Sequence, residues 1–355
     1  MPADFPPVKS LDALPNNLPR QFTSFIGREN EIAEVKRLLA QTPLLTLTGT
    51  GGIGKTRLAL RVAAEALEEF KDGAWLVELA SLSDPALLPH TLASALGIRE
   101  QPGRPLLTTL VDFLQPRTLL LVLDNAEHLV DACAQLADVV LKAGPGLRIL
   151  ATSRERLGVG GEVTWRVPSL TVADPAHPPS VEAFAAYEAI RLFVERAKAG
   201  LPTFTLTQQN APWVAQICYR LDGISLAIEL AAARVNVLTV QQIARRLDDA
   251  FRLLTGGTRT LPRHETLRAA MDWSYNLLSD VERMLLRRLS VFIGMFTLEA
   301  AEAVAQPHSG RLDILDLMTR LVNRSLVAVQ EFGQEARFHL LETVRAAPTA
   351  HDWGS

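Results

Sequence analysis

The sequence predicts an α/β fold in which a domain built on a parallel β-sheet is followed by a small helical domain and a winged-helix domain. Up to about residue 170, short apolar runs typical of buried strands alternate with helical patterns. Beyond residue 180 the strand signals stop and apolar residues recur at helical spacing. Near the end, residues 325–330 and 337–341 flank Phe332-Gly333-Gln334, the pattern of a β-hairpin that follows helices.

Composition limits the class of protein. The chain has 355 residues, 48% of them hydrophobic, which suffices for two or three buried cores. A net charge of −3 gives no overall basic field for nucleic acid or anionic membrane. The two cysteines, Cys133 and Cys218, lack metal-ligand spacing and fit a reducing cytoplasm, so we expect a cytoplasmic protein. No run approaches the roughly 20 apolar residues of a spanning helix, and we expect no membrane partner.

The secondary-structure elements follow from periodicity and from stop signals. Gly97 ends one helical pattern and Pro116 follows another. In the first part, strands are expected at residues 44–48, 74–79, 118–124, 147–154 and 162–167, and helices at 32–39, 58–67, 87–96 and 106–114. Later helices are expected at residues 189–197, 213–221, 226–235, 240–247, 267–275, 281–289, 298–304 and 314–322.

The strongest motif is the glycine-rich loop at residues 49–56, which fits the phosphate-binding pattern G-x-x-x-x-G-K-[ST] between an expected strand and an expected helix. Glycines let backbone N–H groups turn toward phosphate oxygens, and the following helix adds its positive end. Lys55 then reaches the β- and γ-phosphates, and the Thr56 hydroxyl binds Mg²⁺. The alternative is a glycine-rich turn with a chance lysine. We predict a nucleotide site.

Two later strands end in charged side chains. Asp124 closes an apolar run, as a central parallel strand does when it brings an acid to its carboxyl end, where it can hold Mg²⁺ opposite Thr56. The alternative is an Asp-Asn turn. Arg154 follows the next strand and is a candidate reader of the γ-phosphate, with an ordinary surface arginine as the alternative.

Domain limits follow from proline- and glycine-rich stretches, such as residues 168–179 and Gly256-Gly257. We expect a flexible N-terminal arm at residues 1–20, a nucleotide-binding domain at 21–170, a helical domain at 180–256, a winged helix at 257–345 and a polar tail at 346–355.

Five motifs stand in a recognisable order: residues 25–29, the loop at 49–56, and residues 121–125, 152–154 and 221–227. Together they resemble the STAND family of P-loop signal-transduction ATPases, and within it the NB-ARC branch, which includes bacterial regulators of the AfsR and MalT kind. The resemblance spans about residues 20–345.

The resemblance implies a switch that binds ATP or ADP with Mg²⁺. Such proteins close around ADP, and exchange for ATP opens them and allows homo-oligomers to form. In this sequence the resemblance places Asp124 as the Mg²⁺ acid, Arg154 as the γ-phosphate sensor, and His339 on the β-phosphate of ADP. The other expected nucleotide-binding residues are Phe25, Ile26, Arg28, Gly51, Gly52, Ile53, Gly54, Lys55, Thr56, Arg57, Ser225 and Leu226.

Three departures from the family pattern bear on chemistry. The usual Gly-x-Pro is Gly223-Ile224-Ser225, and Leu340 replaces the frequent aspartate after the histidine. The usual pair of acids is Asp124-Asn125, and asparagine cannot accept a proton from the attacking water. Glu127 can replace that base only if the turn brings it inward. We therefore expect a weak ATPase, well below the roughly 1–100 s⁻¹ of good phosphoryl-transfer enzymes.

Three functions compete at this stage: the switch, a nucleotide-regulated transcription regulator that binds DNA through the winged helix, and a P-loop metabolic or motor ATPase. Between residues 258 and 345, eleven arginines less eleven acidic residues leave a net charge of zero. Phosphate binding favours a net positive face, so we do not expect this chain to bind DNA directly.

Overall fold

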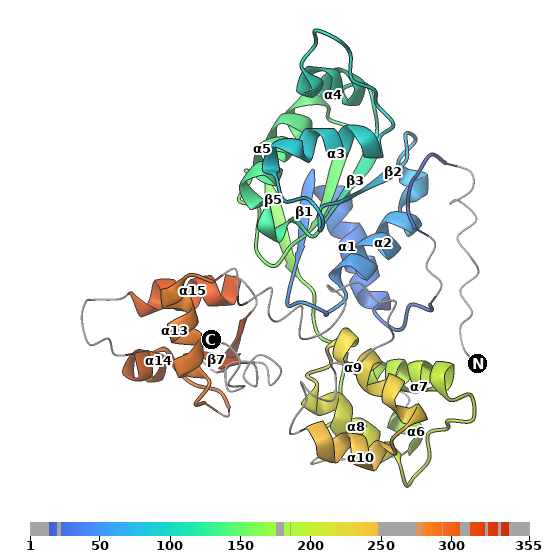
Figure 1. The fold of residues 1–355 in the computed structure, drawn as a ribbon, viewed down its shortest axis with the longest axis vertical. Helices are drawn as coiled ribbons and strands as arrows, with labels where there is room; N and C mark the ends of the chain where they lie inside the picture. Colours follow the sequence, from blue (N-terminus) through green and yellow to red (C-terminus); the bar gives the residue numbers. More distant parts are fainter. Residues whose placement is uncertain are drawn as a thin grey trace. The chain divides into compact units, whose positions relative to one another are not determined.

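The computed structural model describes residues 14–19, 23–174, 181–184, 186–247, 275, 278–292, 294–305, 313–323, 326–332 and 335–340. The chain divides into two compact units. The first contains Met1–Gly49 and Lys55–Val167, and the second contains Thr50–Gly54 and Pro168–Ser355. The middle of the glycine-rich loop thus groups with the C-terminal half of the chain. Figure 1 labels the elements.

The first unit is built on a five-stranded sheet with the order β2-β3-β4-β1-β5, in which all neighbours are parallel. Its strands are β1 (Leu44–Thr48), β2 (Ala74–Glu78), β3 (Leu119–Asp124), β4 (Leu147–Thr152) and β5 (Glu162–Arg166). Its α-helices are α1 (Glu29–Gln41), α2 (Lys55–Glu65), α3 (Leu88–Ala95), α4 (Leu106–Leu114) and α5 (Val130–Ala143). Short 3₁₀ turns lie at η2 (Leu67–Glu69), η3 (Pro85–Leu87) and η4 (Ala126–His128).

The sheet is buried on both faces. On β3, Leu119, Leu121 and Leu123 belong to one apolar cluster with side chains of α3, α4 and α5. Leu120 and Val122 are equally buried and, by alternation along the strand, face the opposite side. The near-continuous apolar composition of β3 follows from this double burial, which is typical of central parallel strands. The predicted parallel α/β sheet is confirmed.

The N-terminal segment pairs with the edge of this sheet. Asn16 forms a parallel bridge with Ala74 of β2. The side-chain amide of Asn17 donates to the carbonyl of Leu76 at 2.8 Å, and its oxygen accepts the N–H of Leu76 at 2.6 Å. Residues 14–19 fall inside the arm that we expected to be flexible, and in the structure they contact the edge strand β2.

The second unit begins with α6 (Val181–Phe184), α7 (Glu188–Gly200), α8 (Ala211–Arg220), α9 (Ser225–Ala232), the 3₁₀ turn η5 (Ala233–Asn236) and α10 (Val240–Arg246). The turn between α8 and α9 has left-handed backbone at Asp222 and Gly223, with φ of 53° and 66°. A Cβ at residue 223 would lie 2.3 Å from the carbonyl oxygen of Leu170, so glycine is required there. Thr239 starts α10 with a capping box.

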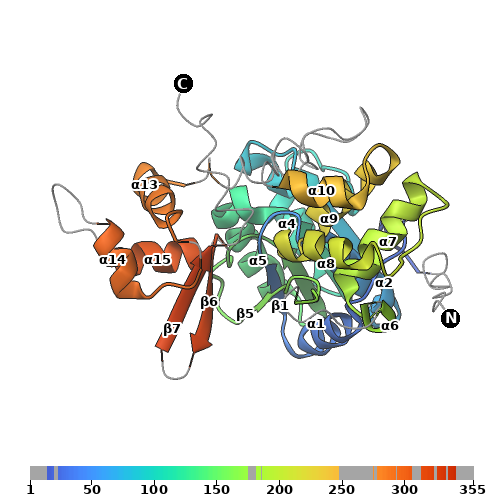
Figure 2. The same ribbon diagram turned by 90° about the horizontal axis from the view of Figure 1, so that it is seen from below.

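The C-terminal part contains α13 (Asp280–Leu289), α14 (Leu298–Ala305) and α15 (Ile314–Asn323), followed by β6 (Val327–Phe332) and β7 (Glu335–Leu340). The two strands form an antiparallel hairpin, which Figure 2 shows beside α15. Phe296 lies in the connection between α13 and α14. It forms an antiparallel bridge with Phe338 of β7. This agrees with the predicted winged helix. The expected helix at 267–275 lies outside the described residues, apart from Tyr275.

Each unit contains one cysteine, Cys133 on α5 and Cys218 on α8, and both are buried. Burial raises the pKa of the Cys133 thiol to about 12 and also raises that of Cys218. In the described part of the chain, no helix is both long and apolar enough to span a membrane.

Candidate nucleotide-binding site

The glycine-rich loop connects β1 to α2, which begins at Lys55. Gly52 and Gly54 have φ of 78° and 97°, in the left-handed region that favours glycine. Backbone N–H groups of such a loop, together with the start of a helix, form an anion-binding concavity. The structure therefore supplies the strand, loop and helix that the motif requires.

Lys55 is buried, with 9% of its surface exposed, and its ammonium donates to the carbonyl of Gly49 at 2.7 Å. The pKa of Lys55 is lowered to about 8, mainly by burial; the charge of Arg154 acts in the same direction, and the charges of Glu127 and Asp124 oppose the shift. A phosphate beside this ammonium would restore the stabilisation that burial removes.

Asp124 is held by two hydroxyl groups. The Thr56 hydroxyl donates to its Oδ1 at 2.7 Å, and the Thr152 hydroxyl donates to the same oxygen at 2.6 Å. Burial raises the pKa of Asp124, and the two hydrogen bonds from the hydroxyls partly offset that rise. The end of β3, the start of α2 and the end of β4 thus meet at one carboxylate.

The donor set fits Mg²⁺. A carboxylate and a hydroxyl are hard oxygen ligands, and Mg²⁺ in nucleotide sites takes few protein ligands because phosphates and waters supply the others. Among the described residues there is no group of three His, Cys, Asp or Glu side chains that could hold a metal. Thr56 and Asp124 are the hard oxygen donors that meet here, and their binding of Mg²⁺ stays a prediction.

Glu127 and Arg154 form a buried ion pair. The Nε of Arg154 donates to Oε1 of Glu127 at 3.0 Å, and the two side chains are only 9% and 4% exposed. Asn125, with φ of 64°, makes the left-handed turn that starts η4 and carries Glu127 inward. Burial lowers the pKa of Arg154 and Glu127 opposes this. Sequence reasoning assigned these residues separate roles and did not foresee that they pair.

Residues 23–28 lie beside α2. Arg57 donates to the carbonyls of Thr23 and Ser24 at 3.1 and 3.0 Å, and its guanidinium lies 5.9 Å from the centre of the Phe25 ring. Arg28 is 3% exposed and has a left-handed backbone with φ of 66°. Arg57 thus holds the segment that includes the expected base-binding residues Phe25, Ile26 and Arg28.

Within the second unit, the loop contacts the start of α9. The N–H of Leu226 donates to the carbonyl of Gly52 at 3.0 Å, and the Ser225 hydroxyl donates to the carbonyl of Ile53 at 3.3 Å. A Cβ at residue 52 would lie 2.9 Å from the Cβ of Leu226. Four residues expected at the nucleotide, from two distant parts of the sequence, are therefore neighbours.

His339 lies on β7 opposite Ala328 of β6. Its contact with the β-phosphate of ADP stays a prediction, as do the nucleotide contacts of the other expected residues.

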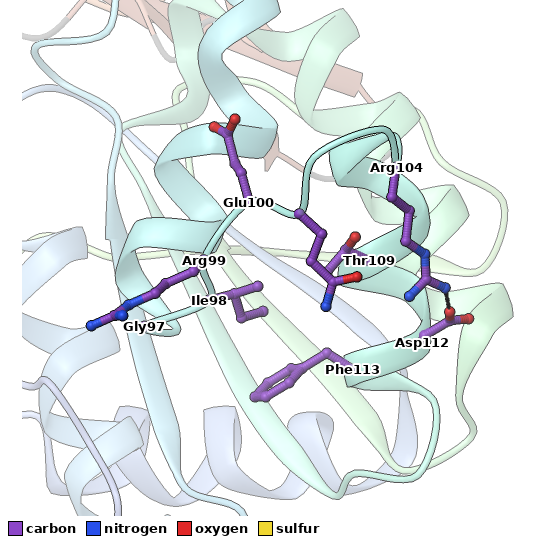
Figure 3. A pocket seen from close by; sticks show the side chains of 9 residues that line it. Gly97, Ile98, Arg99, Glu100, Arg104, Thr109, Asp112 and Phe113 are labelled. Carbon is purple, nitrogen blue, oxygen red and sulfur yellow. Dashed lines mark hydrogen bonds and ion pairs between the residues drawn. The ribbon is translucent and has the colours of Figure 1, made fainter.

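A separate pocket lies where the connection from α3 enters α4. It has a volume of about 450 Å³, and Figure 3 shows Arg104 and Asp112, which bond to each other, among its polar lining. Gly97, Ile98, Arg99, Glu100, Gln101, Arg104, Thr109, Asp112 and Phe113 line it. None of them belongs to the glycine-rich loop, and no sequence motif predicted a site there.

This parallel sheet, with the loop between β1 and α2 and an acid at the end of β3, defines a P-loop ATPase fold. A family model described as an AAA domain matches residues 39–151, and a model described as a winged helix-turn-helix domain matches residues 278–347. The Walker-type ATPase paby2304 of Pyrococcus abyssi has a similar structure. Its TM-score is 0.56 at 15% identity, over 91% of this chain and 96% of that one, a likeness of fold alone.

Sequence relatives define the family more closely. The uncharacterized protein Rv0894 of Mycobacterium tuberculosis is 42% identical over 330 residues, 92% of this chain and 80% of the relative. The putative HTH-type transcriptional regulator Rv0890c of that organism is 47% identical over 88% of this chain and 34% of its own length. The regulatory protein AfsR of Streptomyces griseus is 29% identical over 97% of this chain and 34% of its own length.

The chain belongs to the same family as Rv0894, contains a P-loop ATPase domain and is related to AfsR. It spans about a third of the length of the regulators Rv0890c and AfsR. The winged helix-turn-helix match also leaves our expectation against direct DNA binding without support. The charge count behind it averages over residues 258–345 and does not describe any single face.

Proposed function

We propose that this chain is an adenine-nucleotide switch that acts in transcription regulation, closed around ADP and opened for oligomerisation by exchange for ATP. The observation that carries the proposal is the meeting of Lys55, Thr56 and Asp124 at one edge of the sheet, joined by the 2.7 Å bond between Thr56 and Asp124. When bound, Mg²⁺ would neutralise charge on the phosphates. Relatives named as regulators support the transcriptional output.

The contact between the glycine-rich loop and α9 supports the proposal that nucleotide binding is coupled to the position of this helix. Gly52 and Ile53 accept hydrogen bonds from Leu226 and Ser225 through their carbonyls, so these contacts to α9 do not use the N–H groups of the loop. A ligand on this loop therefore acts on a segment that is bonded to α9. It can shift the switch only by its difference in affinity for the two states.

The pair of Glu127 and Arg154 supplies a difference between ATP and ADP. Removing one partner of a buried ion pair leaves an uncompensated charge, at a cost of about 3–5 kcal/mol. A γ-phosphate can replace Glu127 as the partner of Arg154, whereas ADP has none to offer. We infer that ADP leaves the pair closed, and that ATP opens it and frees Glu127 to act as the base.

Hydrolysis is then slow for two reasons. Asn125 cannot serve as a base, and Glu127 is tied to Arg154 until that bond breaks.

Substitution of Glu127 tests this exchange. In Glu127→Gln the neutral amide holds Arg154 less strongly, so the ratio of ATP to ADP affinity should rise about tenfold, a change of 1.4 kcal/mol, while hydrolysis falls. Both can be measured by calorimetric titration and phosphate release. Glu65→Gln, which weakens the partly exposed ion pairs of Glu65 with Arg61 and Lys36, is the matched control and should change neither. An unchanged affinity ratio in Glu127→Gln would contradict the exchange.

The nucleotide itself tests the switch. Purified protein should release ADP on denaturation, identified by chromatography, and Lys55→Ala should release far less. A native protein that stays empty after incubation with Mg²⁺ and ADP would overturn the proposal.

A second candidate is direct DNA binding, favoured by the winged helix-turn-helix match over residues 278–347. A gel shift on random duplex at several salt concentrations, with ATP and with ADP, separates the candidates. Binding that weakens steeply with salt would show phosphate contacts by this chain. If the protein does not bind duplex DNA even at low salt, the nucleotide switch remains as the single candidate function.

A further inference from the structure

Thr152 is the last residue of β4 and is almost completely buried, with 1% of its surface exposed. It pairs with Leu47 of β1 on one side, and on the other side it lies beside the end of β3, where Ala151 pairs with Leu123 one residue earlier. The parallel register therefore places the Thr152 hydroxyl next to Asp124, the expected Mg²⁺ acid.

This hydroxyl is used twice. It donates to Oδ1 of Asp124 at 2.6 Å and accepts the backbone N–H of Asn125 at 2.9 Å. The first bond fixes the orientation of the carboxylate. The second holds the left-handed turn at Asn125, where φ is 64°, and this turn leads into η4 and Glu127.

The hydrogen bonds to the side-chain carboxylate of Asp124 fall on one of its two oxygens. The hydroxyls of Thr56 and Thr152 both donate to Oδ1, and within the described residues Oδ2 accepts no hydrogen bond. Two donors on one oxygen leave the other lone pairs of the carboxylate for a cation, as residues behind a metal ligand commonly do.

We propose that Thr152 is a positioning residue of the Mg²⁺–nucleotide site, whose hydroxyl orients Asp124 toward the metal and fixes the turn that carries Glu127. The inference rests on the proposed nucleotide function. It adds a residue whose role the sequence motif left unassigned, and it predicts an effect that depends on Mg²⁺.

The chain offers a matched control in Thr46 of β1. This threonine is fully buried in the same sheet, and its hydroxyl makes no hydrogen bond with the described residues. Thr46→Val and Thr152→Val make the same chemical change on neighbouring strands, but only Thr152→Val removes bonds to Asp124 and Asn125.

The experiment measures the dissociation constant of a fluorescent ADP analogue, once with Mg²⁺ and once with EDTA. Thr152→Val should weaken binding about 10- to 100-fold with Mg²⁺, the usual effect of losing a residue behind a metal ligand, and leave binding in EDTA within about twofold. Thr152→Ser keeps the hydroxyl and should bind like the native protein. Thr46→Val should match the native protein in both buffers.

Each other outcome has a distinct meaning. If Thr152→Val loses the same affinity with Mg²⁺ and with EDTA, or loses none in either buffer, the role of Thr152 is overturned. The proposed function then still stands, provided that the native protein binds the nucleotide. A native protein that binds in neither buffer would overturn the proposed function and this inference with it. If circular dichroism shows that Thr152→Val does not fold, Thr152→Ala removes the same hydroxyl and takes its place in the comparison.

Discussion

At the scale of single residues, the first unit concentrates buried charge in one place. Lys55, Glu127 and Arg154 are each less than 10% exposed, and their charges act on one another. Charged side chains are rarely buried unless they are paired, because desolvation is costly. Such a cluster at the carboxyl ends of parallel strands is typical of a functional site rather than of a core.

The lowered pKa of Lys55 predicts a pH dependence of nucleotide binding. Phosphate binds the ammonium form, and with a pKa of about 8 only about one molecule in eleven carries it at pH 9. Affinity for ADP should therefore fall about tenfold between pH 7 and pH 9, and binding at pH 9 should take up a proton. Calorimetric titration in two buffers of different ionisation enthalpy measures both quantities.

The lowered pKa of Lys55 also determines how the stability of the nucleotide-free protein changes with pH. Between about pH 8 and the ordinary value of 10.5, the unfolded chain holds more protons on this lysine than the folded one, so stability contributed by Lys55 rises with pH. Lys55→Met should abolish both trends. An ADP affinity that is flat from pH 7 to pH 9 would contradict the assignment.

The sequence predicted Lys55, Thr56 and Asp124 as site residues because each occupies a fixed place in a local motif, and the structure brings Thr56 and Asp124 within hydrogen-bond distance. It did not predict a role for Thr152. The proposed role depends on β4 lying between β3 and β1, and the order of strands in the sheet differs from their order along the chain. The pairing of Glu127 with Arg154 likewise depends on the left-handed turn at Asn125, which local sequence alone leaves open.

At the scale of elements, the edge strand β2 is completed by a segment that is not itself a strand. The side chain of Asn17 both donates to and accepts from the backbone of Leu76, as a neighbouring strand would. Gly73, just before β2, has φ of 92°, and a Cβ there would overlap the carbonyl oxygen of Pro15. An edge strand with unpaired backbone groups is a template for aggregation, and this segment covers it.

Asn17→Ala should expose this edge. Loss of the two hydrogen bonds should destabilise the first unit by about 1–2 kcal/mol and speed hydrogen exchange at the amide of Leu76. Asn17→Asp keeps the acceptor for that amide and should protect it better than alanine does. Exchange at Leu76 that is the same in native protein and Asn17→Ala would show that the segment does not protect the edge.

Periodicity located the strands of the sheet but missed α5. The buried face of that helix is formed by Cys133, Leu136, Ala137 and Val140, and its small side chains weaken the apolar pattern. The contacts of Asn17 with β2 were not predictable either, because side-chain pairing with a backbone carries no periodic signal.

At the scale of the whole molecule, the order of a P-loop domain and a winged helix was predictable, because each leaves a local pattern. The division found in the structure differs in one informative respect. Residues Thr50–Gly54 group with the second unit although Gly49 and Lys55, their chain neighbours, belong to the first. No composition shift marks such a division, since it arises from packing of the loop against α9.

Gly52→Ala tests the importance of that packing. The new Cβ would lie 2.9 Å from the Cβ of Leu226, in addition to the strain of a φ of 78°. Gly103 has the same φ of 78° with no atom within 4 Å, so Gly103→Ala isolates the strain, about 1–2 kcal/mol. Gly52→Ala should cost more than Gly103→Ala in free energy of unfolding, measured with denaturant.

A double substitution completes the test. Leu226→Ala, introduced into Gly52→Ala, shortens the opposing side chain and should recover part of the excess cost, a positive coupling in a double-mutant cycle. Equal costs for Gly52→Ala and Gly103→Ala, with no coupling, would mean that the loop yields freely at this contact.

The two buried thiols allow the opening of each unit to be followed by chemical labelling. Alkylating reagents attack the thiolate, so neither Cys133 nor Cys218 should be modified until the unit around it opens. Because each unit holds one of them, the order in which a mass spectrometer finds the two peptides tagged reports which half of the chain comes apart first. Dyes can meanwhile be attached to cysteines introduced on the surface without removing the native pair.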